Sequence, residues 1–180
     1  PTNIHHAARR IRRAIATTTN HSRTHNTHAC NDPIRIALLG ASTIAPLAII
    51  RPAEQTALAT VVAVAARDAA RAHAYASKHA IPAAHADYHA VLDDPRVEAV
   101  YIGLVNGMHY EWAAAALRAG KHVLCEKPLT SNADEARALA RLASSQRLVL
   151  AEAFHWAHHP AAQRVRQLAR SGDLGEPFHL

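Results

Sequence analysis

Residues 34–45, IRIALLGASTIA, place a short apolar run directly before a glycine and a turn of small residues. The run is apolar almost throughout rather than alternating, which is typical of a strand covered on both faces, as in a parallel sheet. Gly40 permits the tight turn, and Ala45 is small enough for a following helix to pack on the strand. The stretch is therefore a degenerate form of the Gly-x-Gly-x-x-Gly/Ala pattern that cradles a dinucleotide.

Taken alone this pattern is weak, because a glycine after a strand is more often only a turn. The strand before it and its place in the first βα unit favour the functional interpretation. Ser42 stands where a second glycine would let the backbone approach a pyrophosphate, and its hydroxyl could donate to a phosphate instead. We expect the following helix to aim its free N–H groups at the phosphates. The expected cofactor-binding residues of this turn are Gly40, Ala41, Ser42, Thr43, Ile44 and Ala45.

Apolar runs recur along the chain and alternate with helical patterns. The further runs are 60–65, 97–102, 122–125 and 148–151, and the helical segments between them are 65–79, 109–119 and 131–146. This alternation predicts an α/β fold with a doubly wound parallel Rossmann sheet. A further helix is expected over 160–170, and 176–180 reads as the start of another strand.

The composition excludes several classes of protein. Of the 180 residues, 49% are hydrophobic, which excludes general disorder. No apolar run approaches the roughly 18 residues that suggest a membrane span. The two cysteines, Cys30 and Cys125, are too few for a disulfide framework or a four-thiolate zinc site.

The net charge of +6 is concentrated at the beginning of the chain. Residues 1–31 hold five arginines and no acidic residue, whereas the other 149 residues hold 15 basic and 14 acidic side chains. The globular part is thus nearly neutral, which argues against a nucleic-acid-binding domain.

Residues 1–33 show no sustained periodicity, and we interpret them as a disordered or artefactual leader. An Arg-rich, acid-poor leader also fits organelle targeting. A third alternative is a metal or RNA contact through His5, His6, His21, His25 and His28. The leader holds no apolar signal-peptide core, so secretion is not indicated and we expect a cytoplasmic protein.

In an open parallel sheet, ligands bind beyond the carboxyl ends of the strands. Arg67 and Asp68 follow the run 60–65. A site for NAD would place Asp or Glu there to accept from the ribose 2′-OH, whereas the Arg67 guanidinium suits a 2′-phosphate. NADP is therefore the expected cofactor, with NAD possible. The alternative is that Arg67 is a solvated residue and Asp68 only caps a helix.

Polar residues also follow the third and fourth runs. Leu104, Asn106 and His109 are candidates for the nicotinamide end of the cofactor, although Asn106 could equally cap a helix. Glu126 and Lys127 follow 122–125, where both charges would be partly desolvated. A lysine in such a place can hydrogen-bond a substrate hydroxyl and help carry its proton. A Glu-Lys-Pro tripeptide is otherwise most often a surface turn.

Together these motifs resemble, in order and spacing, the amino-terminal half of the Gfo/Idh/MocA oxidoreductases. The resemblance covers 34–180 and is closest to the glucose–fructose oxidoreductase, sugar dehydrogenase and dihydrodiol dehydrogenase branch. The run GKHVLCEKPL at 120–129 is its most specific piece. The other matching stretches are 36–45, 62–68, Asn106-x-x-His109 and EAFHWAHHP at 152–160.

The resemblance implies a dinucleotide-binding Rossmann domain at 34–158. It implies a linking helix and the first residues of a second, α+β domain at 159–180, where the sequence stops. Family members move hydride between NAD(P) and a sugar, polyol or related diol. Lys127 matches the catalytic lysine that contacts the reacting hydroxyl and the nicotinamide ribose, and Glu126 matches its partner at the cofactor. The bond between Lys127 and Pro128 is commonly cis in the family, and an arginine at Arg67 goes with NADP.

The sequence also departs from the family pattern. Ser42 replaces the second glycine, and Ala157 stands where the family usually has arginine. The family's second catalytic side chain, a His or Tyr, most of the substrate pocket and the expected homo-oligomer interface lie in the missing domain. The leading hypothesis is a fragment of an NADP-dependent dehydrogenase, and the alternative is a catalytically inactive NADP(H)-binding or sensing module. No metal site is expected, because His155, His158 and His159 do not fall on one helix face.

Overall fold

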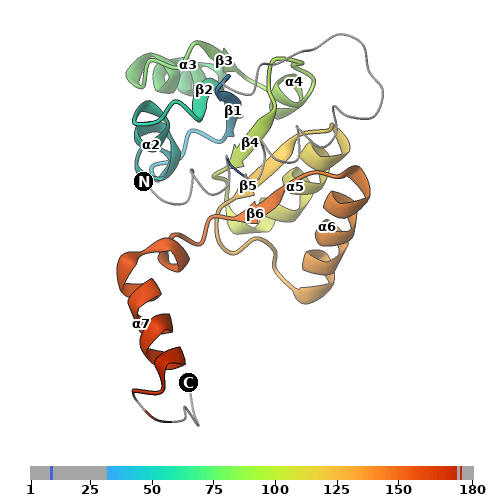
Figure 1. Cartoon of the computed structure of the whole chain (residues 1–180). Helices are drawn as coiled ribbons and strands as arrows, with labels where there is room; N and C mark the ends of the chain where they lie inside the picture. The colour runs from blue at the N-terminus through green and yellow to red at the C-terminus, as the bar shows by residue number, and fades with distance from the viewer. Residues whose placement is uncertain (1–8, 10–31, 174, 176–180) are drawn as a thin grey trace.

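The computed structural model describes residue 9, residues 32–173 and residue 175. The leader proposed for residues 1–33 and the strand expected at 176–180 therefore lie almost wholly outside the described residues. The described part is a layered α/β domain from which the last helix projects (Figure 1).

Six parallel strands form one sheet in the order β3-β2-β1-β4-β5-β6, which confirms the doubly wound Rossmann prediction. The chain order reverses between β1 and β4, and ligands bind at this switch point in open α/β sheets. The strands are β1 Ile34–Leu39, β2 Ala59–Ala65, β3 Ala83–His85, β4 Ala99–Ile102, β5 His122–Cys125 and β6 Leu150–Glu152.

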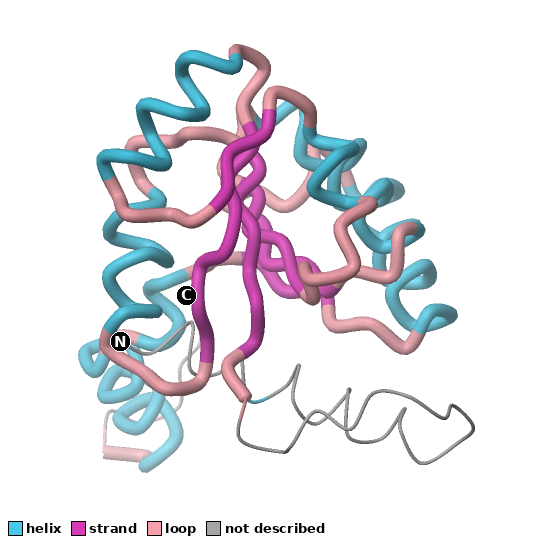
Figure 2. Tube along the Cα trace, turned by 90° about the horizontal axis from the view of Figure 1, so that it is seen from above, coloured by secondary structure: helices cyan, strands magenta, loops and turns pink. Residues whose placement is uncertain are grey.

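Helices cover both faces of this sheet, as the view in Figure 2 shows. On one face Ile36 and Leu38 of β1 pack with Ile49 of the first crossover. On the other face Ala37 and Leu39 pack with residues of α4, α5 and α6. Alternate residues of one strand thus enter two cores, which explains why the run is apolar throughout. The helices are η1 Pro46–Ile50 (a π-helical turn continued by α2 Arg51–Glu54), α3 Ala69–Lys78, α4 Tyr88–Leu92, η2 Asn106–Met108, α5 His109–Arg118, α6 Ala133–Gln146, η3 His155–His158 and α7 Pro160–Ser171.

Local signals explain most helix ends. Gly120 and Gly172 follow α5 and α7 in the left-handed conformation, with φ of 77° and 83°, which glycine adopts without strain. The helix expected over 131–146 begins at Ala133, because Asn132 caps it: the Asn132 side chain accepts the N–H of Glu135, and the Glu135 side chain in turn accepts the N–H of Ser131.

Among the strands and α-helices, two are absent from the sequence prediction, the edge strand β3 and the short helix α4. The three residues of β3 are Ala83, Ala84 and His85, which carry no β-branched or aromatic signal. A five-residue helix such as α4 is too short to show a period. The predicted helix over 65–79 begins only at Ala69, because β2 runs to Ala65 and the Asp68 side chain caps α3.

Two glycines bring the loops after β1 and β4 into contact at the switch point. Gly40 has a φ of +101°, and a Cβ there would lie 2.9 Å from Leu104 Cδ2 and 3.0 Å from the Gly103 carbonyl oxygen. A Cβ on Gly103 would lie 2.6 Å from Ser42 Oγ. Neither position accepts a larger residue without displacing its neighbours.

Candidate functional site

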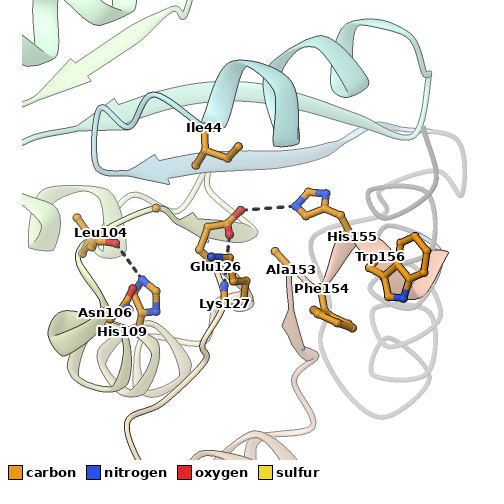
Figure 3. A pocket seen from close by; sticks show the side chains of 11 residues that line it. Ile44, Leu104, Asn106, His109, Glu126, Lys127, Ala153, Phe154, His155 and Trp156 are labelled. Carbon is orange, nitrogen blue, oxygen red and sulfur yellow. Dashed lines mark hydrogen bonds and ion pairs between the residues drawn. The ribbon is translucent and has the colours of Figure 1, made fainter. Parts of the chain in front are cut away.

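Two adjoining cavities open at the carboxyl ends of the strands, on either side of the switch point. The first, the β1–β2 cavity, has a volume of about 610 Å³ and lies between the loops after β1 and β2 and the start of α3. The second, the β5–β6 cavity, has a volume of about 520 Å³ and lies between the loops after β4, β5 and β6 (Figure 3). Gly103 and Leu104 line both cavities, so the two are halves of one cleft.

Ten of the predicted site residues line one or both halves of this cleft, and Ala45 lies beneath it. His109 also borders it, although its side chain is fully buried. Ala45 lines neither half: it is fully buried under the β1 turn, which suits its expected role in helix packing. Gly40, Ala41, Ser42, Thr43, Arg67 and Leu104 line the β1–β2 cavity, and Ile44, Leu104, Asn106, Glu126 and Lys127 line the β5–β6 cavity.

Side chains of α3 hold the turn after β1. Arg71 Nη2 donates to the Ala41 carbonyl oxygen at 3.0 Å, and the Tyr75 hydroxyl donates to the Ser42 carbonyl oxygen at 2.8 Å. In a trans peptide the N–H points opposite to the C=O. The N–H groups of Ser42 and Thr43 are therefore turned away from these α3 side chains. Burial raises the pKa of Tyr75 to about 12, so its hydroxyl stays protonated and keeps donating.

The start of the first crossover helix differs from the expectation that it presents free N–H groups. Ala45 donates its N–H to Ser42 Oγ at 3.3 Å, Pro46 has no N–H, and Leu47 and Ala48 both donate to the carbonyl oxygen of Ile44. Because these donors are used within the turn, backbone contacts to an anion must come from the loop that precedes the helix. The Ser42 hydroxyl accepts from Ala45 and retains its own proton for donation.

The β1–β2 cavity carries two guanidinium groups. Arg67 and Arg71 both line it. Asp68 also borders it, but one of its carboxylate oxygens accepts the N–H of Arg71 at 2.7 Å and so caps α3. The capping interpretation of Asp68 is confirmed, and it is compatible with a binding role for Arg67. Arg71 and Tyr75 are not among the residues predicted from the sequence, although their i, i+4 spacing on the expected helix places them on one face.

Glu126 is the centre of a polar network in the β5–β6 cavity. Its side chain is 12% exposed and lies 3.5 Å (Oε1) from His155 Nε2. The Tyr101 hydroxyl donates to the same oxygen at 2.7 Å, and the N–H of Lys127 approaches Oε2 at 3.3 Å. Burial, followed by the adjacent carboxylate, raises the pKa of Tyr101, which keeps this phenol a neutral donor. Tyr101 is not among the residues predicted from the sequence, because it is a buried residue of an apolar strand.

Lys127 borders the same cavity but differs from Glu126 in its environment. Glu126 is partly desolvated, as expected, whereas Lys127 is exposed. The expectation that both charges are desolvated is thus correct only for the carboxylate. The peptide bond between Lys127 and Pro128 is cis.

His109 connects the two loops that flank this cavity. Its Nδ1 lies 2.6 Å from the carbonyl oxygen of Pro128, and its Nε2 lies 3.0 Å from that of Leu104. The ring therefore ties the loop after β4 to the loop after β5 and fixes the width of the cavity between them. Asn106 is exposed, and the interpretation of Asn106 as a side-chain cap is wrong: the N-cap of η2 is Val105, with no side-chain cap bond.

The histidines near the end of the described chain are separately engaged. His155 faces Glu126, and His159 Nδ1 accepts the N–H of Ala161 at the start of α7. Among the described residues, no group of three or more His, Cys, Asp or Glu side chains is arranged to hold a metal ion. None of the helices in this part of the chain is long and apolar enough to cross a membrane.

Comparison with known proteins gives a consistent result. The model of the Gfo/Idh/MocA oxidoreductase family, described as an NAD-binding Rossmann fold, matches residues 34–154. A D-xylose 1-dehydrogenase (NADP(+)) from Haloferax volcanii is 43% identical over 138 residues, 77% of this chain and 42% of the relative. The trans-1,2-dihydrobenzene-1,2-diol dehydrogenase of Homo sapiens is 44% identical over 116 residues, 64% of this chain and 35% of the relative.

A solved structure agrees with these sequence relatives. The 3-ketoreductase from Actinomadura kijaniata, in complex with NADP, superposes with a TM-score of 0.75 at 36% identity. The match covers 81% of this chain and 46% of that chain. The chain thus spans less than half the length of each of these three proteins.

Proposed function

The chain belongs to the Gfo/Idh/MocA family of oxidoreductases with an NAD-binding Rossmann fold, and on this premise we propose that its cleft binds NADP(H). We further propose that, within the longer protein, this half serves hydride transfer between the nicotinamide and a carbinol carbon of a sugar, polyol or related diol. The named activities of the xylose dehydrogenase and the dihydrodiol dehydrogenase support that substrate class.

The residues of the cleft fit a dinucleotide. At the centre, Gly40 and Gly103 leave a cradle that a Cβ would fill. The turned-out N–H groups of Ser42 and Thr43, together with the free proton of the Ser42 hydroxyl, suit a pyrophosphate. Ile44 provides an apolar wall at the entrance to the β5–β6 cavity, as a flat aromatic ring requires.

The charges of the β1–β2 cavity favour NADP over NAD. No carboxylate directly follows β2, since Ala66 and Arg67 occupy those positions, and Asp68 is engaged in capping α3. Arg67 and Arg71 offer guanidinium groups to a 2′-phosphate, which they can bind by charge-assisted hydrogen bonds. The NADP(+) named for the xylose dehydrogenase and the NADP in the 3-ketoreductase structure support the same assignment.

In the β5–β6 cavity the chain's own residues position the reacting groups. When bound, the nicotinamide donates or accepts the hydride. Lys127 donates a hydrogen bond from Nζ to the substrate oxygen and orients the carbinol carbon. Glu126, held by the Tyr101 hydroxyl, accepts from cofactor hydroxyls and limits the position of the ribose. His109 keeps the loops that carry these groups at a constant separation.

One observation carries this proposal: the same cleft presents two arginines at one end and the Glu126–Lys127 pair at the other, across the switch point of the sheet. Titrating the 180-residue chain with NADPH, followed by nicotinamide fluorescence, tests the cofactor assignment. Saturable binding that is tighter than NADH binding is the expected result, and no binding of either cofactor would overturn it.

A second experiment separates an enzyme from a binding module. The longer protein, assayed with NADP(+) against a panel of sugars, polyols and diols, should reduce the cofactor with at least one of them. Binding without turnover across the panel would favour the inactive NADP(H)-sensing alternative.

We also propose that the longer protein is a homo-oligomer assembled through its second domain. Light scattering that shows a monomer would exclude this proposal.

A further inference from the structure

Tyr88 brings a hydroxyl group without a protein partner to the β1–β2 cavity. The side chain lines this cavity and is only 7% exposed. Its hydroxyl has no hydrogen-bond partner among the described residues, and the oxygen retains contact with solvent. Polar groups of residues buried to this degree are usually paired. A tyrosine hydroxyl left open to a cavity therefore points to a bound ligand as its partner.

The packing of the ring fixes where this hydroxyl lies. Tyr88 is the first residue of α4, and the Asp87 side chain caps this helix by accepting the N–H of His89 at 3.0 Å. The Trp112 ring of α5 meets the Tyr88 ring edge to face, with the two centroids 4.8 Å apart and an interplanar angle of 75°. Because the ring is held by the helix start and by the indole, the hydroxyl needs little further ordering when a ligand binds.

The lining of the β1–β2 cavity divides into a charged part and an uncharged part. The charged side chains that line it are Arg67, Asp68 and Arg71, which precede α3 or belong to it. On the α4 side, and after β4, the lining side chains are uncharged: Tyr88, Val105 and Met108. Helices α3 and α4 cover opposite faces of the sheet near β3 (Figure 1). The cavity thus offers separate places to the anionic and the uncharged parts of one ligand.

We propose that the Tyr88 hydroxyl hydrogen-bonds the purine of the bound cofactor. The two guanidinium groups attract phosphate, which leaves the uncharged lining for the base. Val105, which is 69% exposed, and Met108 supply apolar surface for the flat face of a purine. The edge of adenine carries ring nitrogens that accept and an amino group that donates. A phenolic hydroxyl both donates and accepts, so it pairs with either. This inference rests on the proposed binding of NADP(H) in the cleft.

Tyr88→Phe tests the contact, because it removes the hydroxyl and keeps the ring against Trp112. NADPH and NADH, each titrated into the 180-residue chain by nicotinamide fluorescence, should bind about three- to tenfold more weakly, the size of one net hydrogen bond. The ratio of the two dissociation constants should not change, since both cofactors carry the same purine. Tyr110→Phe is the matched control: Tyr110 of α5 lines neither cavity, so both constants should stay as they are.

Two further measurements separate a ligand contact from a packing role. The hydroxyl has no partner in the described part of the protein, so Tyr88→Phe should not lower the free energy of unfolding of the cofactor-free chain in urea. Reduced nicotinamide cytosine dinucleotide keeps the pyrophosphate and both riboses but carries a pyrimidine in place of the purine. Its affinity should fall much less than that of NADH in Tyr88→Phe.

Several outcomes would overturn the inference while cofactor binding by the unaltered chain stands. Unchanged affinity for NADPH and NADH would remove Tyr88 from the site. A loss confined to NADPH would assign the hydroxyl to the 2′-phosphate, and equal losses for NADH and the cytosine dinucleotide would exclude the purine. A fall in stability together with affinity would make Tyr88 a packing residue. No binding of NADPH or NADH by the unaltered chain would overturn the inference and the proposed function together.

Discussion

Two lysines flank strand β5, and they differ in burial. Lys121, at the amino end, is 8% exposed, and its Nζ donates to the carbonyl oxygens of Asp94 and Val97 at 2.8 and 2.9 Å. Lys127, at the carboxyl end, is exposed and borders the β5–β6 cavity. Both belong to the same family-specific run, yet one completes a buried hydrogen-bond set and the other faces a ligand-sized space.

The histidines near β5 repeat this contrast. His122 at the start of the strand is buried, and its Nδ1 accepts the N–H of Val149 at 3.0 Å. His155, near the far end, lies 3.5 Å from Glu126, and both side chains line the β5–β6 cavity. Residues at the amino edge of the sheet thus stabilise the fold, and those at the carboxyl edge are available for chemistry.

The largest expected effect is on turnover, when Lys127 at the carboxyl end of β5 is substituted. Lys127→Ala in the longer protein should lower kcat about 10²- to 10⁴-fold, because a positioned proton-transfer and orienting group is lost. NADPH affinity should change far less, since the proposed phosphate contacts lie in the β1–β2 cavity. Steady-state kinetics and fluorescence titration measure the two quantities. Lys78→Ala, at the exposed end of α3, is the control. An unchanged kcat would remove Lys127 from the mechanism.

A substitution of Lys121, at the amino end of β5, should instead lower the stability of the fold. Lys121→Met removes the donor from the carbonyl oxygens of Asp94 and Val97, the second of them in a buried hydrogen bond, and we expect a loss of about 2–4 kcal/mol in the free energy of unfolding. Urea denaturation of the 180-residue chain measures this, with Lys78→Met as the matched control. If NADPH affinity fell while stability stayed constant, the two ends of β5 would not divide structure from chemistry as described.

Acid should destabilise the fold through His122. Burial lowers the pKa of His122 to about 4, whereas an unfolded histidine titrates near 6.5. Between these values the unfolded chain binds more protons than the folded chain, so stability is full above about pH 6.5 and falls as the pH falls. The contribution lost by pH 4 is about 3 kcal/mol. Urea midpoints at several pH values measure it, and a stability independent of pH over this range would contradict it.

The smallest expected effect concerns cofactor choice at the β1–β2 cavity. Arg67→Asp should shift the preference from NADP towards NAD by ~1–3 kcal/mol, because one charge-assisted phosphate contact is lost and a ribose acceptor is gained. Ratios of kcat/KM or of binding constants for the two cofactors report the shift. Arg118→Asp, at the exposed end of α5, should leave the preference unaltered. An equal shift in both variants would mean that Arg67 acts only through net charge.

Sequence reasoning predicted the fold where local pattern and tertiary environment agree. The strand at 122–125 is correct to the residue, because a run that is buried on both faces contains only residues suited to burial. β3 was missed because an edge strand of three residues needs little hydrophobicity. The motifs also identified ten of the residues that line the cleft, since a glycine turn and a charged pair after a strand leave local signals.

The remaining site residues leave no such signal. Tyr101 reads as one more apolar position of β4, and its role depends on Glu126, 25 residues later. Arg71 and Tyr75 act on carbonyl oxygens 30 and 33 residues earlier in the chain. Contacts over these distances depend on how strands and helices pack, which a local pattern does not contain.

By itself, therefore, the sequence determined the parallel α/β sheet, the glycine turn after β1 and the polar residues that follow the strands. These depend on backbone conformation and on burial patterns that span only a few residues. Only the tertiary structure decided that Lys121 is buried while Lys127 borders a cavity, and that His155 lies beside Glu126. Such differences arise because the packing of separate segments sets how far each charge is exposed to water and which group lies beside it.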